Sequence, residues 1–157
     1  MRPARFHQFA IDTLPKAPDV QAVEDGGESG RPYSLHVTFT NGSQVWIGVT
    51  GTLAPGDKYD IEEQPVHGDA PSEIPYPPLF DSGNVTPATA QAYLAAATTN
   101  TGNTEILAAE PYNDDDVQNP GFGVTFHNGA KIWCLFTHTA RAGQARGNRA
   151  YDLQGSF

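Results

Sequence analysis

Cysteine is almost absent from this chain: Cys134 is the one example among 157 residues. A single thiol forms no disulfide within the chain and cannot complete a zinc site made of several cysteines. Apolar runs are also short, and none approaches the roughly 20 residues of a membrane-spanning helix. Residues 1–7 lack the apolar run of a signal peptide. We therefore expect a soluble cytoplasmic protein that does not contact a membrane.

Basic residues are scarce as well. Nine lysines and arginines stand against 18 aspartates and glutamates, which gives a formal net charge of −9. An acidic surface repels the phosphate backbone of nucleic acids, so binding to duplex DNA is disfavoured. The charge suits a basic partner or a cation, or it serves solubility alone.

Turn-forming residues, in contrast, are abundant, with 16 glycines and 13 prolines. Such a composition argues against a helical bundle. The length fits one ordinary domain with a buried core.

Two segments of the chain resemble each other. Residues 37–50 (VTFTNGSQVWIGVT) and 124–137 (VTFHNGAKIWCLFT) are identical at half of their positions without a gap. Weaker similarity extends upstream of both segments. We interpret this as an internal tandem duplication, because matches that include a tryptophan rarely arise by chance over so short a span.

The duplication predicts an α+β fold made of two units, each with a helix followed by three strands. The two units would pack as a pseudo-twofold pair, with a mostly antiparallel sheet and the helices on one face. The predicted layout is a single domain over 1–157, divided into repeat 1 (1–52), a proline-rich connector (53–85), repeat 2 (86–139) and an arginine-containing tail (140–157). The connector is expected to be extended or wrapped on the domain, and the tail either moves freely or docks on acidic loops.

Each unit begins with a predicted amphipathic helix. Pro15 limits the end of the first helix, and Thr86 is the expected N-cap of the second, directly before Pro87. The expected buried positions are Phe6, Phe9, Ala10 and Leu14 in the first helix and Ala90, Tyr93, Leu94 and Ala97 in the second.

The Asn-Gly pairs at 41–42 and 128–129 lie between alternating apolar runs and predict β-hairpins. A two-residue turn would pair Thr40 with Ser43 and scatter apolar side chains over both faces. A three-residue turn pairs Phe39 with Ser43 and gathers the apolar side chains on one face, so we predict this register. The buried sets are then Leu35, Val37, Phe39, Val45, Ile47 and Val49, and Phe122, Val124, Phe126, Ile132, Cys134 and Phe136.

The same register places Trp46 and Trp133 on the opposite face, at equivalent positions of the two units. Exposed aromatic rings on a sheet can stack a sugar, a base or a side chain of a partner. Burial by the connector, by the other unit or by a second chain is the alternative for both rings. The candidate binding residues on this face are Trp46, Trp133, His36, Gln44, Lys131 and Thr125.

No catalytic motif is present, and we predict neither catalytic residues nor a cofactor. The acidic segments 24–28 and 113–116 do not match a calcium-binding loop, so solvated turns are the simpler interpretation and no metal site is predicted. Cys134 falls on the buried face, where a thiol acts as a small apolar group.

Three functional hypotheses remain open. The first is a non-enzymatic binding or assembly protein that contacts another protein, or a second copy of itself, through the tryptophan-bearing face or the acidic loops. The second is a module that stacks a small molecule or single-stranded nucleic acid on the paired tryptophans. The third is a small enzyme that combines His127 or His138 with the carboxylates of 114–116.

Overall fold

The computed structural model describes residues 1–112 and 119–157 of the chain. It contains two α-helices, a six-stranded antiparallel sheet and a small two-stranded sheet, so the predicted α+β class is confirmed. The elements in chain order are α1 (Pro3–Thr13), η1 (Leu14–Lys16, a 3₁₀-helix), β1 (Val20–Asp25), β2 (Leu35–Phe39), β3 (Gln44–Thr52), β4 (Phe80–Asp81), β5 (Asn84–Val85), α2 (Pro87–Thr99), β6 (Ile106–Pro111), β7 (Gly121–Phe126) and β8 (Lys131–Ala140).

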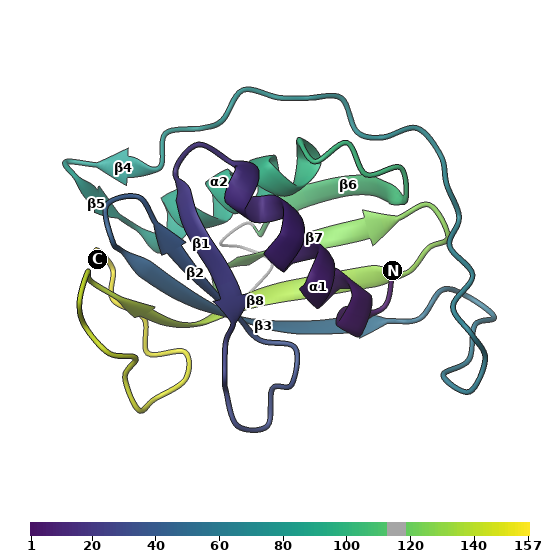
Figure 1. Ribbon diagram of the computed structural model, residues 1–157, viewed down its shortest axis with the longest axis horizontal. Helices are drawn as coiled ribbons and strands as arrows, with labels where there is room; N and C mark the ends of the chain where they lie inside the picture. Colours follow the sequence, from purple (N-terminus) through teal and green to yellow (C-terminus); the bar gives the residue numbers. More distant parts are fainter. Residues whose placement is uncertain (113–118) are drawn as a thin grey trace.

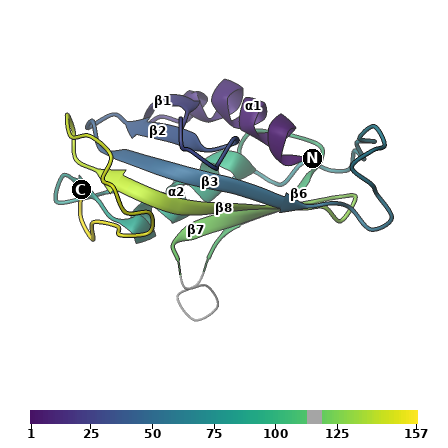
Figure 2. The same ribbon diagram turned by 90° about the horizontal axis from the view of Figure 1, so that it is seen from below.

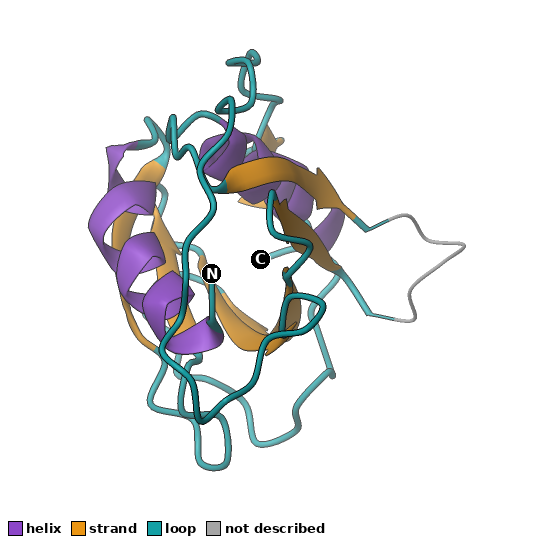
Figure 3. Cartoon of the chain, turned by 90° about the vertical axis from the view of Figure 1, so that its right-hand side faces the viewer, coloured by secondary structure: helices purple, strands orange, loops and turns teal. Residues whose placement is uncertain are grey.

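The large sheet has the strand order β1-β2-β3-β8-β7-β6, and each half contributes one helix and three strands in the same order along the chain. The two longest strands, β3 and β8, pair at the centre and join the halves (Figure 2). α1 packs on β1 and β3, whereas α2 packs on β6 and β7 (Figure 1). Figure 3 shows the sheet curling around the core. The tandem duplication itself stays a prediction from the sequence.

Both predicted helices form, and the predicted residues are buried except Phe9, which is half-buried. Phe6, Ala10 and Leu14 are buried in and after α1, and the chain tightens into η1 where Pro15 follows Leu14. Thr86 caps α2: its hydroxyl accepts a hydrogen bond from the Thr89 amide at 3.1 Å. The Thr89 hydroxyl lies 3.0 Å from the Thr86 amide and completes a capping box.

The three-residue turn is confirmed in both hairpins. The Phe39 amide donates to the Ser43 carbonyl at 2.9 Å, and the Phe126 amide donates to the Ala130 carbonyl at 3.0 Å. Gly42 and Gly129 adopt the left-handed conformation that this turn requires, with φ of 88° and 87°. The alternating apolar residues consequently share one face of the sheet.

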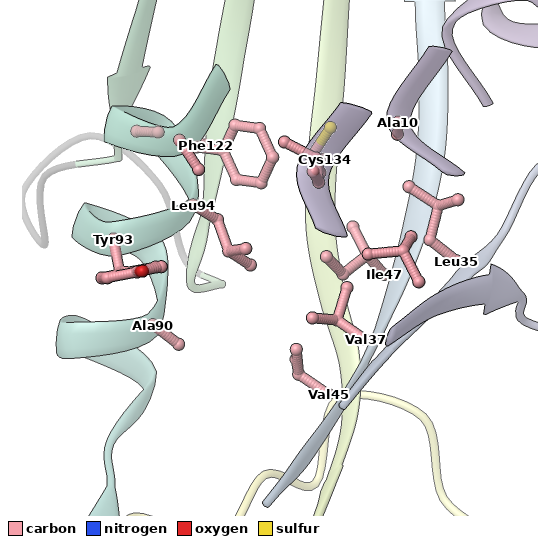
Figure 4. Close-up of a cluster of buried hydrophobic side chains, with 14 of the residues drawn as sticks. Ala10, Leu35, Val37, Val45, Ile47, Ala90, Tyr93, Leu94, Phe122 and Cys134 are labelled. Atoms are coloured by element: carbon pink, nitrogen blue, oxygen red, sulfur yellow. The ribbon is translucent and has the colours of Figure 1, made fainter. Parts of the chain in front are cut away.

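The core lies between that face and the two helices. Figure 4 shows Ala90, Tyr93 and Leu94 of α2 on one side and strand residues such as Ile47 on the other. Cys134 is fully buried among them, as predicted, and burial raises the pKa of its thiol far above neutrality. No helix in the described residues is long and apolar enough to cross a membrane.

The connector is ordered and not helical, as the prolines predict. It follows the outside of the molecule in Figure 1 and ends in the β4–β5 hairpin. The tail docks instead of extending away: Phe157 is buried and exchanges two backbone hydrogen bonds with Val85, at 2.7 and 2.9 Å.

The cap of α2 provides a stability test. Replacing Thr86 with alanine removes the acceptor for the Thr89 amide and should lower the free energy of unfolding by about 1 kcal/mol. Urea unfolding followed by circular dichroism measures this change. Ser72→Ala on the exposed connector is the control, and equal stability of the two variants would contradict the capping role.

Candidate functional site

The outer face of the sheet, opposite the helices, carries the predicted binding residues. Trp46 on β3 lies between His36 on β2 and His138 on β8 in the strand register. The rings of Trp46 and His36 stack with centroids 4.3 Å apart and planes 4° apart. Trp46 is only 7% exposed, so its ring is not a free stacking platform in this structure.

The C-terminal tail is bound to Gln44, which neighbours Trp46 on the same face of β3. The Gln44 side-chain amide donates to the carbonyl oxygens of Arg141 and Gln144, at 3.1 and 2.9 Å. Its carbonyl oxygen lies 3.0 Å from His36 Nε2. Gln44 therefore joins His36 to the tail, and both predicted residues serve to hold the chain's own segments together.

The second tryptophan has a different environment. Trp133 on β8 is half-buried and lies between Thr50 on β3 and Gly123 on β7. Lys131 is exposed and pairs with Thr125 at the end of the hairpin. Trp46 and Thr50 are four positions apart on β3, or about 13 Å at the usual rise per residue. The structure does not bring the two indoles together.

A cluster around Glu28 was missed by sequence reasoning. The Glu28 side chain is only 2% exposed, although its segment has the composition of a solvated turn. Thr137 donates its hydroxyl proton to Glu28 Oε1 at 2.8 Å, and His138 Nδ1 lies 2.9 Å from the same oxygen. Arg146 of the tail and Arg31 are close by, with nitrogen–oxygen distances of 3.9 and 4.0 Å.

A β-bulge brings Thr137 and His138 to the same carboxylate. Opposite Trp46 and Ile47 of β3, β8 contains an additional residue, Thr137, so the register shifts by one. His138 lies inside β8. The bulge allows two consecutive side chains to contact Glu28, which links β8 to the 26–34 loop and to the tail.

His138 is poorly suited to bind a substrate in this arrangement. Its side chain is 8% exposed, and its ring meets the Trp46 ring edge-on at 6.4 Å. Burial, together with Arg146 and Arg31, lowers its pKa against the opposing effect of Glu28. The other predicted base, His127, bonds the Asp69 carbonyl at 2.9 Å, and residues 114–116 lie outside the described residues.

The connector bears most of the exposed apolar side chains. Among the described residues, five of the eight large apolar side chains that are exposed lie on it. Four exposed carboxylates lie among them: Asp60, Glu62, Asp69 and Glu73. None of the four forms an ion pair with another described residue. We name this surface the connector strip; it consists of Tyr59, Asp60, Ile61, Glu62, Val66, Asp69, Glu73, Ile74 and Tyr76.

Ionic contacts anchor the first end of the strip. Glu63 accepts hydrogen bonds from Arg5 at 2.9 Å and from the Arg2 amide at 2.8 Å. Arg5 also donates a hydrogen bond from Nη2 to Oε1 of Glu105, the residue before β6, at 2.6 Å. The Arg5 guanidinium lowers the pKa of Glu63 to about 2. The neighbouring Asp57 accepts from Arg2 at 3.1 Å.

The other end of the strip rests on α2. Asn100, which caps the helix, exchanges two hydrogen bonds with the backbone of Ile74, both at 2.8 Å. Tyr76 stacks on the buried Tyr93 with ring centroids 5.2 Å apart. The strip is therefore held at both ends while Tyr59 and Ile61 remain 72% and 52% exposed.

In the part of the chain that the structure describes, no group of three or more histidine, cysteine, aspartate or glutamate side chains could hold a metal ion. Comparison with models of known protein families, with curated proteins and with solved structures finds no match. The surfaces described above therefore carry the functional argument.

The lowered pKa of His138 predicts a pH dependence of stability. The unfolded chain binds a proton near the usual pKa of 6.5, whereas the folded chain resists it, so stability should fall as the pH drops below about 6.5. His138→Asn retains a donor near Glu28 without a titrating ring. Its melting temperature should change less between pH 7.5 and 5 than that of the native chain; parallel profiles would contradict this assignment.

The Glu63 contacts predict the same sign of pH dependence at a lower pH. Because the folded pKa is about 2 and the ordinary value is 4.5, the stabilisation is complete above pH 4.5 and is lost as the pH falls toward 2. Glu63→Gln should cost about 1 kcal/mol at neutral pH, since Arg5 is partly exposed. Urea unfolding should show this difference shrinking below pH 4.5, with Glu62→Gln as the control.

Proposed function

We propose that this chain is a non-enzymatic binding protein that uses the connector strip to contact a basic, partly apolar surface of a partner protein. The observation that carries the proposal is the concentration of exposed aromatic and aliphatic side chains on a single anchored segment. Isolated apolar side chains on a surface are ordinary, but five of them along one segment, with carboxylates between them, favour an interaction site.

Anchoring favours binding because the strip loses little conformational freedom when it meets a partner. The Glu63 contacts at one end and the Asn100 contacts at the other already fix its course. Tyr59 and Tyr76 supply the large, amphipathic rings that often dominate the energy of protein interfaces.

Charge defines the kind of partner. Asp60, Glu62, Asp69 and Glu73 present carboxylates beside the apolar side chains, on a chain of net charge −9. A partner with lysines or arginines around an apolar centre would be attracted at long range and would pair with these carboxylates at the rim.

The tryptophan-bearing face contributes less to this proposal. Trp46 is only 7% exposed, and the His36 and His138 rings pack against it. Trp133 remains half-buried beside the exposed Lys131, and Leu107 of β6 is the one large apolar side chain of the described strands that is as exposed as Ile61.

A peptide-binding experiment tests the proposal. The probe is a fluorescent peptide in which lysine and leucine alternate, and its affinity is measured by anisotropy. Tyr59→Ser combined with Ile61→Ser should weaken binding about tenfold, which corresponds to about 1.4 kcal/mol. Leu107→Ser removes a similarly exposed side chain from β6 and should leave the affinity unchanged.

Two further peptides separate charge from apolar contact. Replacing the lysines with glutamates, or the leucines with serines, should abolish binding or weaken it strongly. Equal binding of all three peptides would overturn the proposal. Sedimentation of the chain alone should show a monomer; a dimer that the Tyr59 and Ile61 substitutions dissociate would assign the strip to self-association instead.

A further inference from the structure

A cavity of about 110 Å³ opens on the outer face of the sheet, between the 26–34 loop and the tail. Gly48, Thr50 and Leu135 of the central strands line its floor, and Arg31, Pro32 and Tyr151 line its walls. A dry cavity of about 150 Å³ can hold benzene. This cavity thus has room for a compact group of a few heavy atoms. Tyr151, in its wall, is exposed to solvent.

Arg31 supplies the single formal charge in the lining. Among the described residues its guanidinium has no hydrogen-bond partner, and the nearest carboxylate oxygen, Glu28 Oε1, is 4.0 Å away. A guanidinium offers several donors in one plane and matches a carboxylate in a two-point contact. The donors of Arg31 are thus open to an anion.

The surrounding charges also favour an anion. Glu28 is already contacted by Thr137 and His138 and faces Arg146 at 3.9 Å. Two guanidinium groups therefore approach one carboxylate, and of these three charged groups only Arg31 lines the cavity. The partial burial of Arg31 strengthens its attraction for a ligand over that of a fully solvated group.

The backbone is arranged to leave this cavity open. Gly48 has no side chain, and a Cβ atom there would meet Arg31 Cδ at 3.4 Å and Thr137 Cγ2 at 3.3 Å. Tyr151 has φ of 70°, a conformation that costs free energy for a residue other than glycine. Its amide donates to the Thr137 carbonyl at 2.7 Å, and its ring packs against the Arg31 guanidinium at 5.5 Å.

From these features we propose that the cavity binds a short-chain aliphatic monocarboxylate. The carboxylate accepts hydrogen bonds from Arg31, and the Thr50 hydroxyl is available as a further donor. The alkyl chain lies against Leu135 and Pro32. This site is separate from the connector strip and does not depend on the function proposed for it.

Butyrate is the test ligand. In an NMR titration of the ¹⁵N-labelled chain at constant ionic strength, butyrate should shift the amide signals of Gly30, Gly48, Thr50 and Tyr151 with a saturable dependence on concentration. Butanol and butylamine, which have the same chain without the anion, should bind at least about tenfold more weakly. Inorganic phosphate should also bind more weakly because it gains nothing from Leu135 and Pro32.

Variants identify the residues responsible. Arg31→Gln should weaken butyrate binding about tenfold. Arg149 is an exposed arginine of the tail that does not line the cavity, so Arg149→Gln should have no effect. Leu135→Ser keeps the arginine and should reduce the preference for butyrate over acetate, which tests the site even if Arg31→Gln disturbs the loop. The proposal is overturned if the shifts do not saturate, if butanol or phosphate binds as tightly, or if both arginine variants behave alike.

Discussion

The pairing of β3 with β8 is the interaction on which the remaining structure depends. Among residues 1–112 and 119–157 it is the only ladder in the large sheet that joins the two halves, and it runs from Gln44 opposite Ala140 to Thr52 opposite Lys131. Because these strands are central, the helices on one face and the loop and tail on the other are all positioned by them. Ile47 and Cys134 of these two strands contribute to the core on one face. On the other face, the same strands contact Glu28 and form the floor of the cavity at Arg31.

Local signals were sufficient to predict both helices and the two Asn-Gly hairpins, but not the short β4–β5 hairpin at the end of the connector. The Asn-Gly turns and the alternation of apolar residues determined the hairpin register, and Thr86 before Pro87 determined the start of α2, because each depends on near neighbours in the chain. The order of strands across the two halves was not predictable in this way. It requires contacts between residues nearly a hundred positions apart, for which the sequence contains no local signal.

The environment of the site residues also depended on contacts between distant positions that the sequence does not reveal. Glu28 lies in a segment whose glycines and carboxylates are typical of a solvated turn, and it is buried only because Thr137, His138 and Arg146 arrive from distant positions. The gapless similarity equates Thr50 with Thr137, yet Thr50 is exposed and Thr137 is fully buried beside the bulge. In the connector, composition predicted an extended path but did not distinguish the buried Leu79 from the exposed Ile74, since their difference arises from the residues that each contacts on the folded domain.

The bulge at Thr137 makes the two halves of the sheet unequal. On one side the outer surface receives the chain's own tail, through Gln44 and the backbone of Thr137, and substitutions there must remain compatible with a fixed internal occupant. On the other side, Lys131 is exposed and Trp133 is half-buried, and the hydrogen bonds of the tail, residues 140–157, do not reach either of them. Substitutions near the bulge must therefore preserve the contacts with the tail, whereas a substitution at the exposed Lys131 does not touch those contacts.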